Sequence, residues 1–281
     1  MDKNLKKELK KTACKIRLGV IKGVYSAKSG HPGGSLSIAD IMAYLYFSYL
    51  NVKADEPKWE NRDRFVLSKG HSAPALYAAL ALKGYFPIEE MEKLRKTGEM
   101  LQGHPDMKKI PGVDFSTGSL GQGLSGAVGM ALAGKLDNKD YRVVAVCGDG
   151  EIQEGQIWEA AMFASAKKLS NLTVVVDNNN LQIDGTIEEV NSPYPIAEKF
   201  AAFGFNVIEI NGHCFDEIEQ AFSSADLCTD RPTAIIAKTV KGKGVSFMED
   251  KASWHGSAPN QEQYELATAE LNETLKALEV E

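Results

Sequence analysis

Residues 142–179 read RVVAVCGDGEIQEGQIWEAAMFASAKKLSNLTVVVDNN. Two short runs, at 143–146 and 172–176, are predominantly apolar on both faces of an extended chain. This pattern is typical of strands in a parallel sheet that helices cover on both sides. The stretch between the runs, from about residue 154 to 168, has the length of a crossover helix. The segment therefore predicts a strand–helix–strand unit of an α/β protein.

The same alternation continues on either side of this unit. We expect strands at 64–67, 142–147, 172–176, 206–210 and 233–240, and helices near 5–27, 37–50, 73–83, 121–135, 154–168, 195–203, 215–225 and 261–279. The predicted fold class is therefore α/β, with a doubly wound, mainly parallel sheet and helices on both faces. No internal repeat, low-complexity tract or clear linker divides the chain, which favours a single domain over residues 1–281.

Composition excludes several classes of partner. The chain has 281 residues, a net charge of −6 and a pI near 5.5, and an acidic surface repels nucleic acid. No stretch approaches the roughly 20 apolar residues of a membrane span. The basic run at 3–15 has apolar residues at helical spacing and no signal-peptide core, so it indicates a solvated helix face. The four cysteines have no CxxC spacing, and as reduced thiols they favour the cytoplasm.

Glycine clusters gather at the predicted strand ends. Five of them are expected in loops, at 29–34, 69–71, 117–123, 148–150 and 241–244. Three directly follow a predicted strand, namely those at 69–71, 148–150 and 241–244. Because open α/β sheets bind ligands outside the carboxyl ends of their strands, several polar loops are expected to converge on one edge.

Two polar segments on successive strand ends predict a metal site. Gly148-Asp149-Gly150 follows one strand, and Asp177-Asn178-Asn179-Asn180 follows the next. If those strands are adjacent, their ends lie about 4.8 Å apart, so that a carboxylate and an amide oxygen can reach one cation. Oxygen ligands suit Mg²⁺, which completes its octahedron with waters and phosphates. The flanking glycines would let a diphosphate approach the backbone.

At this point the sequence resembles a known family. The segment GDGEIQEG at 148–155, the WEA at 158–160, the NLTVVVDNN at 171–179 and the IDG at 183–185 closely resemble the thiamine diphosphate motif of transketolases. The resemblance implies thiamine diphosphate as cofactor and Mg²⁺ as the ion, for which Ca²⁺ or Mn²⁺ can substitute. It also implies that Asp149, the Asn179 side chain and the Leu181 carbonyl bind the ion, with Asn179 and Gly150 beside the diphosphate.

Four of the five histidines stand beside glycine or proline in segments that resemble the family's active-site loops. The resemblance implies that His71 and His255 contact the diphosphate and that His255 also faces substrate. It implies that His31 and His104 line the channel to the thiazolium and bind the donor sugar. Imidazole suits these tasks because it can donate, accept or shuttle a proton near neutral pH. His213 has no such context and is predicted to be structural.

The segment at 117–123 superficially resembles a nucleotide-binding G-x-G-x-x-G, but it lacks the preceding strand that would confirm one. It is more similar to the family segment in which Gly118, Ser119 and Leu120 contact the cofactor's rings. The helix after it is rich in small residues, which in the family form the interface between chains; a tightly packed core helix is the alternative. Glu154 and Glu159 match family glutamates at that interface. Lys241 and Lys243 are equally compatible with a phosphate contact and with a solvated turn.

The resemblance covers nearly the whole chain, yet full-length transketolases are more than twice as long. Their second domain holds the aminopyrimidine and supplies the glutamate that activates the cofactor. We therefore expect the chain to be a single thiamine diphosphate- and Mg²⁺-binding domain with N- and C-terminal helical extensions. It would be the N-terminal subunit of a split transketolase, paired with a separate C-terminal subunit in an α2β2 heterotetramer. Its expected reaction moves a two-carbon ketol unit between phosphosugars.

Other functions remain open at this stage. The chain is also compatible with a subunit of a 1-deoxyxylulose-5-phosphate synthase-like enzyme, a 2-oxo-acid dehydrogenase α-like protein, or a transketolase-like enzyme for an unusual sugar. A non-catalytic, cofactor-binding regulatory subunit is a further alternative, and a Rossmann-type nucleotide protein is another. The set of four histidines favours transketolase, because sugar hydroxyls need several donors and acceptors.

Overall fold

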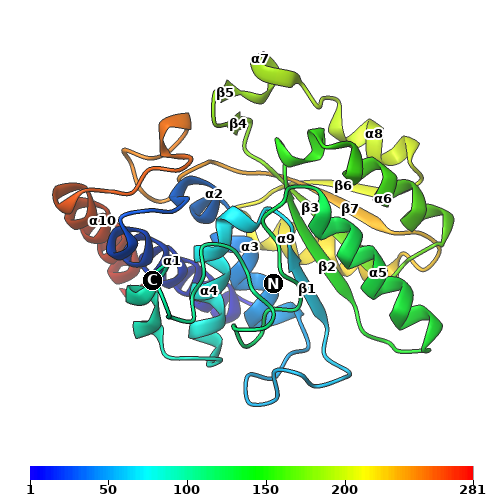
Figure 1. Cartoon of the computed structure of the whole chain (residues 1–281), viewed down its shortest axis with the longest axis horizontal. Helices are drawn as coiled ribbons and strands as arrows, with labels where there is room; N and C mark the ends of the chain where they lie inside the picture. The colour runs from blue at the N-terminus through cyan, green and yellow to red at the C-terminus, as the bar shows by residue number, and fades with distance from the viewer. Residues whose placement is uncertain (281) are drawn as a thin grey trace.

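A parallel five-stranded sheet forms the centre of the protein, with helices on both faces (Figure 1). The computed structural model describes residues 1–280, and the strand order is β1-β2-β3-β7-β6. The sheet strands are β1 (Arg64–Leu67), β2 (Val143–Gly148), β3 (Leu172–Asn178), β6 (Asn206–Asn211) and β7 (Thr233–Lys238). The α-helices are α1 (Lys3–Ala27), α2 (Pro32–Ser37), α3 (Ala39–Tyr44), α4 (Ala73–Lys83), α5 (Gln122–Leu136), α6 (Gly155–Ala166), α7 (Ile187–Asn191), α8 (Ile196–Ala202), α9 (Phe215–Leu227) and α10 (Gln261–Val280).

Alternate residues of the central strands enter two separate cores. Val144 and Val146 of β2 face the core that α1, α3, α4, α9 and α10 cover. Val143, Ala145 and Cys147 face the other core, which α5, α6 and α8 cover. Successive side chains of a strand point to opposite faces, so a strand buried between two helical layers is apolar along most of its length. The predicted doubly wound α/β fold is confirmed.

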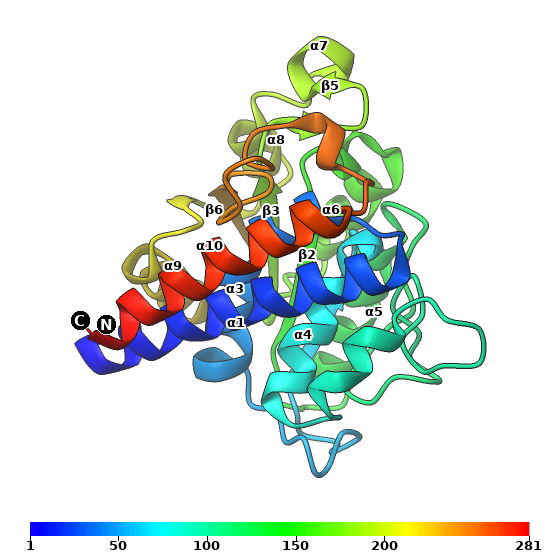
Figure 2. The same ribbon diagram turned by 90° about the vertical axis from the view of Figure 1, so that its left-hand side faces the viewer.

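The first and last helices lie side by side on one face (Figure 2). Cys14 of α1 donates its thiol to the Leu271 carbonyl of α10, and the Lys7 ammonium donates to the Glu279 carbonyl. These contacts place the start of α1 beside the end of α10. Across residues 1–280, no helix combines the length and the apolar character needed to cross a bilayer.

One predicted helix is wrong in its bounds. The sequence predicts a single helix over 37–50, whereas the chain forms α2, then α3, then a π-helical turn at Leu45–Tyr49. The segment at 29–34, predicted to be a loop, already enters α2 at Pro32, whose fixed φ suits the first turn of a helix. Its glycines are needed for close packing, because a Cβ on Gly33 would meet the Trp254 carbonyl oxygen at 2.8 Å.

A short arm after β3 was not foreseen. It consists of the two-residue strands β4 (Leu181–Gln182) and β5 (Gly185–Thr186), followed by α7. It projects above the carboxyl end of the sheet (Figure 1). Two-residue strands are too short to show alternation, so the sequence carries no periodic signal for them.

The small residues of α5 have mixed roles. Added side chains at Gly123, Gly126 and Gly134 would collide with Ser68, Phe115 and Tyr141 of the same chain. A side chain at Gly129 would meet nothing within 4 Å. Much of the small-residue pattern therefore serves packing within the chain, and a contact with another chain through Gly129 stays a prediction.

Candidate active site

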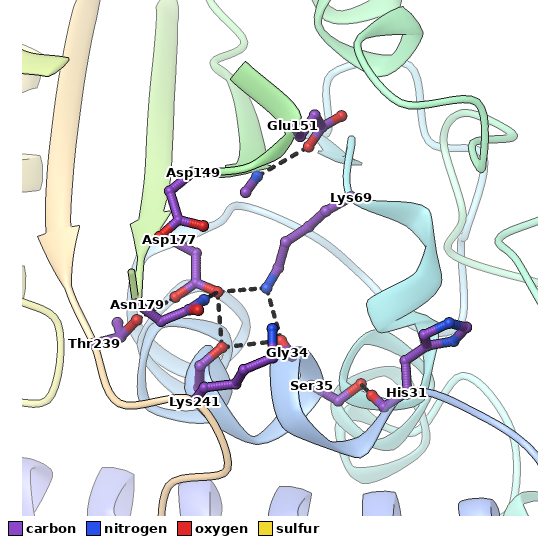
Figure 3. A network of polar contacts seen from close by, with 12 residues as sticks. His31, Gly34, Ser35, Lys69, Asp149, Glu151, Asp177, Asn179, Thr239 and Lys241 are labelled. Atoms are coloured by element: carbon purple, nitrogen blue, oxygen red, sulfur yellow. Dashed lines mark hydrogen bonds and ion pairs between the residues drawn. The ribbon is translucent and has the colours of Figure 1, made fainter. Parts of the chain in front are cut away.

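The ends of β2 and β3 meet as the sequence predicts. The two strands are parallel neighbours, and Gly148 is paired with Asp177. Asp149 follows β2 directly, and Asn179 follows β3, so both lie at the same edge of the sheet (Figure 3). This juxtaposition is the geometric requirement for a shared cation.

Asp149 is a buried carboxyl group whose hydrogen bonds come from backbone amides. One of its oxygens accepts from the Gly150 amide at 2.9 Å, and the other accepts from the Asn180 amide at 2.6 Å. Burial, followed by the nearby charge of Asp177, raises the pKa of Asp149 to about 7. Among the described residues it makes no ion pair, and the charge of Lys241 offsets the effect of burial only in part. A divalent cation would supply the missing positive charge, so the carboxyl group fits a metal ligand.

Asn179 and Leu181 lie beside Asp149 on the loop after β3. The Asn179 amide nitrogen donates to Asp177 at 3.0 Å, while its oxygen accepts from the Leu181 amide at 3.2 Å. The Leu181 carbonyl accepts from the Lys241 ammonium at 3.1 Å. This donor set of one carboxylate, one amide and one carbonyl oxygen suits a hard divalent ion. No group of three His, Cys, Asp or Glu side chains suited to a metal is found in residues 1–280.

Three histidines from distant segments form a cluster beside this edge. The ring centroids of His31 and His71 are 5.2 Å apart, those of His31 and His255 are 5.5 Å apart, and those of His71 and His255 are 5.2 Å apart. His104 stands against Gly118, where an added Cβ would lie 3.1 Å from the ring. The Nδ1 atoms of His31 and His255 are buried and have no hydrogen-bond partner within residues 1–280. Such atoms fit a ligand that brings its own donors and acceptors.

The cluster is electrically neutral at physiological pH. Burial, then the charge of Arg95, lowers the pKa of His31 to about 4. Burial, then the charge of Lys241, lowers the pKa of His255 to about 3, and burial lowers the pKa values of His71 and His104 as well. Neutral imidazoles both donate and accept, so these side chains are suited to bind hydroxyl and phosphate oxygens.

Replacing His255 by glutamine should weaken the acid sensitivity of the cofactor-free protein. The pKa of His255 falls from its ordinary 6.5 to about 3 on folding. Between those values the unfolded chain binds a proton that the folded chain excludes, so the free energy of unfolding decreases as the pH falls. The variant should show a shallower decrease between pH 7 and 5 in denaturant unfolding experiments. Equal slopes in the variant and the wild type would contradict the buried, neutral state.

The predicted site residues surround one cavity of about 380 Å³. Ten of the eleven predicted residues line it, namely His31, His71, His104, Gly118, Leu120, Asp149, Gly150, Asn179, Leu181 and His255. The exception is Ser119, which is exposed in the same loop and does not line the cavity. His213 lies elsewhere, between Asp40 at 2.7 Å and the Val240 amide at 2.9 Å, in the structural role that its sequence context suggested.

Sequence reasoning missed two charged residues of the cavity and left a third, Lys241, undecided between a phosphate contact and a solvated turn. Lys69, Glu151 and Lys241 all line the cavity and are buried. Burial, then the charge of Lys69, lowers the pKa of Lys241 to about 8. The solvated-turn interpretation is wrong for Lys241 and suits Lys243, which pairs with Glu249 at 3.2 Å near the surface. The position of Lys241 just after a strand was the available signal for its role.

Glu151, in the wall of the cavity, forms hydrogen bonds with three separate segments. Its carboxylate accepts from the Ser68 hydroxyl at 2.6 Å, the Gly121 amide at 3.0 Å and the Gly148 amide at 2.9 Å. Burial nevertheless raises its pKa. Because Gly121 ends the 118–121 loop and Gly148 ends β2, this side chain holds the start of α5 against the end of the sheet.

A histidine-lined cavity with an acidic and amide edge lies at the carboxyl end of a doubly wound sheet, the place where open α/β proteins bind ligands, and its donor groups fit a metal-bound diphosphate. Residues 9–275 match the family model described as "Transketolase, thiamine diphosphate binding domain". The chain belongs to this family, as its motif predicted.

Two of its relatives are named as parts of divided enzymes. The chain is 50% identical over 242 residues to the SqwG subunit of the 6-deoxy-6-sulfo-D-fructose transketolase of Clostridium sp. (strain MSTE9), covering 86% of this chain and 88% of that protein. It is 45% identical over 267 residues to one subunit of the apulose-4-phosphate transketolase of Phocaeicola vulgatus, covering 95% of each. The chain is therefore of the N-terminal transketolase subunit type, as predicted.

Other relatives are much longer. The human transketolase is 45% identical over 249 residues, which are 88% of this chain and 39% of that protein. The crystal structure of the Campylobacter jejuni transketolase superposes with a TM-score of 0.90 at 34% identity, covering 97% of this chain and 43% of that one. The chain thus spans less than half the length of these transketolases.

Proposed function

We propose that the chain, together with a separate C-terminal subunit, transfers a two-carbon ketol unit from a ketose phosphate to an aldose phosphate. The observation that carries this proposal is the single cavity in which four histidines face a carboxylate–amide edge. The histidines suit a polyhydroxylated substrate, and the edge suits a metal-bound diphosphate. Neither the histidines nor the carboxylate–amide edge alone would distinguish a ketol transferase from other diphosphate-binding proteins.

The ion and the diphosphate have separate binding groups in this proposal. Asp149, the Asn179 oxygen and the Leu181 carbonyl would hold Mg²⁺, with Ca²⁺ or Mn²⁺ as substitutes. Gly150, Asn179, His71 and His255 would lie along the diphosphate, and Lys241 adds a buried positive charge to that side. Gly118, Ser119 and Leu120 would lie against the rings of the cofactor. Bound thiamine diphosphate supplies the electron sink that ketol transfer requires.

His31, His104 and His255 would act on the sugar. Their pKa values are lowered, so the rings would be neutral when substrate arrives. A neutral ring can donate to a carbonyl or accept from a hydroxyl without first losing a proton. We assign these three residues to orienting the donor and to moving protons at its carbonyl and hydroxyl groups.

The partner subunit would complete the site. We infer an α2β2 heterotetramer in which the C-terminal subunit contributes the activating glutamate and part of the sugar site. Relatives of similar length are named as subunits, which supports a divided enzyme. Met162 and Phe163 are exposed on α6, which packs against α5, and they give this face an apolar character suited to a contact between chains. A cytoplasmic location stays a prediction.

A second candidate differs in the sugar. Relatives at 50% and 45% identity are named for 6-deoxy-6-sulfo-D-fructose and apulose 4-phosphate. We therefore also propose, as the alternative, a transketolase that acts on such an unusual sugar. The partner's side of the sugar site would decide between the two.

We expect ketol transfer only from the complex of the two subunits. The chain would be assayed alone and as the complex captured from its native source, with Mg²⁺ and thiamine diphosphate. Xylulose 5-phosphate would be one donor, 6-deoxy-6-sulfo-D-fructose the other, and ribose 5-phosphate the acceptor. Activity of the complex on the first donor supports the main proposal, and activity on the second alone supports the alternative. Full activity of the isolated chain would refute the partner requirement.

A further inference from the structure

A buried ion pair lies directly behind the proposed metal site (Figure 3). The Lys69 ammonium is 2.5 Å from the Asp177 carboxylate, and the side chains are only 2% and 0% exposed. Lys69 follows β1 and Asp177 belongs to β3, with β2 between them in the sheet. The lysine therefore extends across the end of β2, where its stem passes Gly148. Replacing such a pair by apolar residues of similar volume is often neutral for stability, so stability alone does not explain it.

The Asp177 carboxylate collects donors from four separate segments. Lys69 and the Ser37 hydroxyl of α2 donate to one oxygen, the latter at 2.7 Å. The Asn179 amide donates to the same oxygen at 3.0 Å, and the Thr239 hydroxyl donates to the other. The charge of Lys69 keeps the pKa of Asp177 below its usual value although burial acts to raise it. The carboxylate is thus an obligatory acceptor at the point where these segments meet.

This acceptor fixes which end of the Asn179 amide faces the cavity. A carboxylate can only accept, so the contact with Asp177 requires the NH₂ end of the side chain. The amide oxygen is then left on the opposite side, where it accepts from the Leu181 amide. An oxygen, not an amide nitrogen, is the group that a hard divalent ion binds.

Lys69 connects Asp177 to the segment that carries His31. Its ammonium also donates to the Gly34 carbonyl at 2.7 Å, in the first turn of α2 beside His31. Without a cation at this position, Asp177 would leave an uncompensated charge next to Asp149. Lys69 therefore balances the acceptor that orients Asn179.

We propose that Asp177 and Lys69 form a positioning pair, in which Asp177 presents the Asn179 oxygen to the metal ion and Lys69 neutralises and holds Asp177. The pair acts through Asn179 and does not itself bind the ion. This inference rests on the proposed function, because it assumes that Asn179 binds Mg²⁺.

Two charge-free double variants test the pair. Asp177→Asn/Lys69→Met keeps an acceptor at position 177. The carbonyl of the new asparagine can accept from Asn179 while the amide nitrogen of the new asparagine faces Thr239. Asp177→Leu/Lys69→Met removes the acceptor, together with the amide that faces Thr239, and keeps a side chain of similar size. The readout is the Mg²⁺ concentration for half-maximal thiamine diphosphate binding, measured by calorimetry on the complex with the partner subunit. We expect the leucine variant to need about 10–100-fold more Mg²⁺ than wild type, which is the usual effect of losing a group that orients a metal ligand. The Mg²⁺ concentration that the asparagine variant needs should stay within about 3-fold of wild type.

The outcomes separate this inference from the proposed function. If both variants fold, judged by thermal unfolding, and need the same Mg²⁺ concentration, the positioning role is refuted. If leucine prevents folding, Asp177→Ala/Lys69→Met tests the same loss of acceptor with a smaller side chain. If the wild-type complex binds thiamine diphosphate without any requirement for Mg²⁺, the metal assignment fails first, and the inference fails with it.

Discussion

The Asp149→Ala variant is expected to lose Mg²⁺-dependent binding of thiamine diphosphate while the protein stays folded. Asp149 is the only carboxylate among the three proposed ligands, and a hard cation depends on that charge. Loss of a group that merely orients a ligand costs about 10–100-fold in metal affinity, so loss of the ligand itself should cost at least about 100-fold. Calorimetry of the complex with its partner subunit would measure the cofactor affinity at fixed Mg²⁺.

The fold should tolerate this change. Asp149 is buried, and burial raises its pKa to about 7 against the opposing charge of Lys241, so its charged form is unfavourable in the absence of a further cation. Asp184→Ala is the matched control, since Asp184 is an exposed carboxylate of the arm after β3 and does not line the cavity. Unchanged cofactor affinity in Asp149→Ala, with the partner present, would refute the metal assignment.

His31→Ala is expected to reduce the turnover number by about 10²–10⁴-fold, the usual range for loss of a proton-transfer group. Cofactor affinity should change little, because the diphosphate contacts are assigned to other residues. The imidazole lies at the start of α2 with its Nδ1 atom free of protein partners. Steady-state kinetics of the complex would give the turnover number, and calorimetry would give the cofactor affinity.

His31→Gln separates hydrogen bonding from proton transfer. Glutamine keeps a donor and an acceptor but cannot take up a proton near neutral pH. His31→Gln should be more active than His31→Ala if the main role of His31 is to orient the sugar. The two variants should be equally inactive if its main role is proton transfer. A large loss of cofactor affinity in either variant, or a turnover number equal to wild type in His31→Ala, would contradict the assigned role.

The sheet could be predicted because its strands are buried on both faces. β1 and α4 match their predicted bounds, and β2 and β3 differ by one or two residues at their ends. Apolar runs between glycine-rich ends leave little ambiguity in such a fold. The region at 32–49 was predicted poorly because its glycines and proline suggest a loop, whereas close packing against Trp254 and Ser72 requires them within a helix.

The site was predictable where a short segment carries its own signal. Asp149 and Asn179 follow strands directly, and the histidines stand in glycine-rich loops. Lys69 was missed, and Lys241 was left undecided between a phosphate contact and a solvated turn, because a lysine in a sequence indicates solvent unless a partner is known. The partner of Lys69 lies 108 residues further along the chain, and only the assembled sheet brings the two together. Ser119 is the opposite case, because the sequence placed it in the site together with Gly118 and Leu120, whereas only those two neighbours line the cavity.

The pairing of α1 with α10 has a consequence for how the chain matures. Within residues 1–280, α1 is synthesised long before α10, and its surface around Cys14 packs against residues near Leu271, while its other apolar side chains pack against α3 and α4. This part of α1 therefore has no native partner until α10 has been synthesised. Contacts between segments so far apart cost much loop-closure entropy and slow the search for the native state. Until α10 has emerged, this surface of α1 is open to aggregation, and a chaperone that shields it would be of most use then.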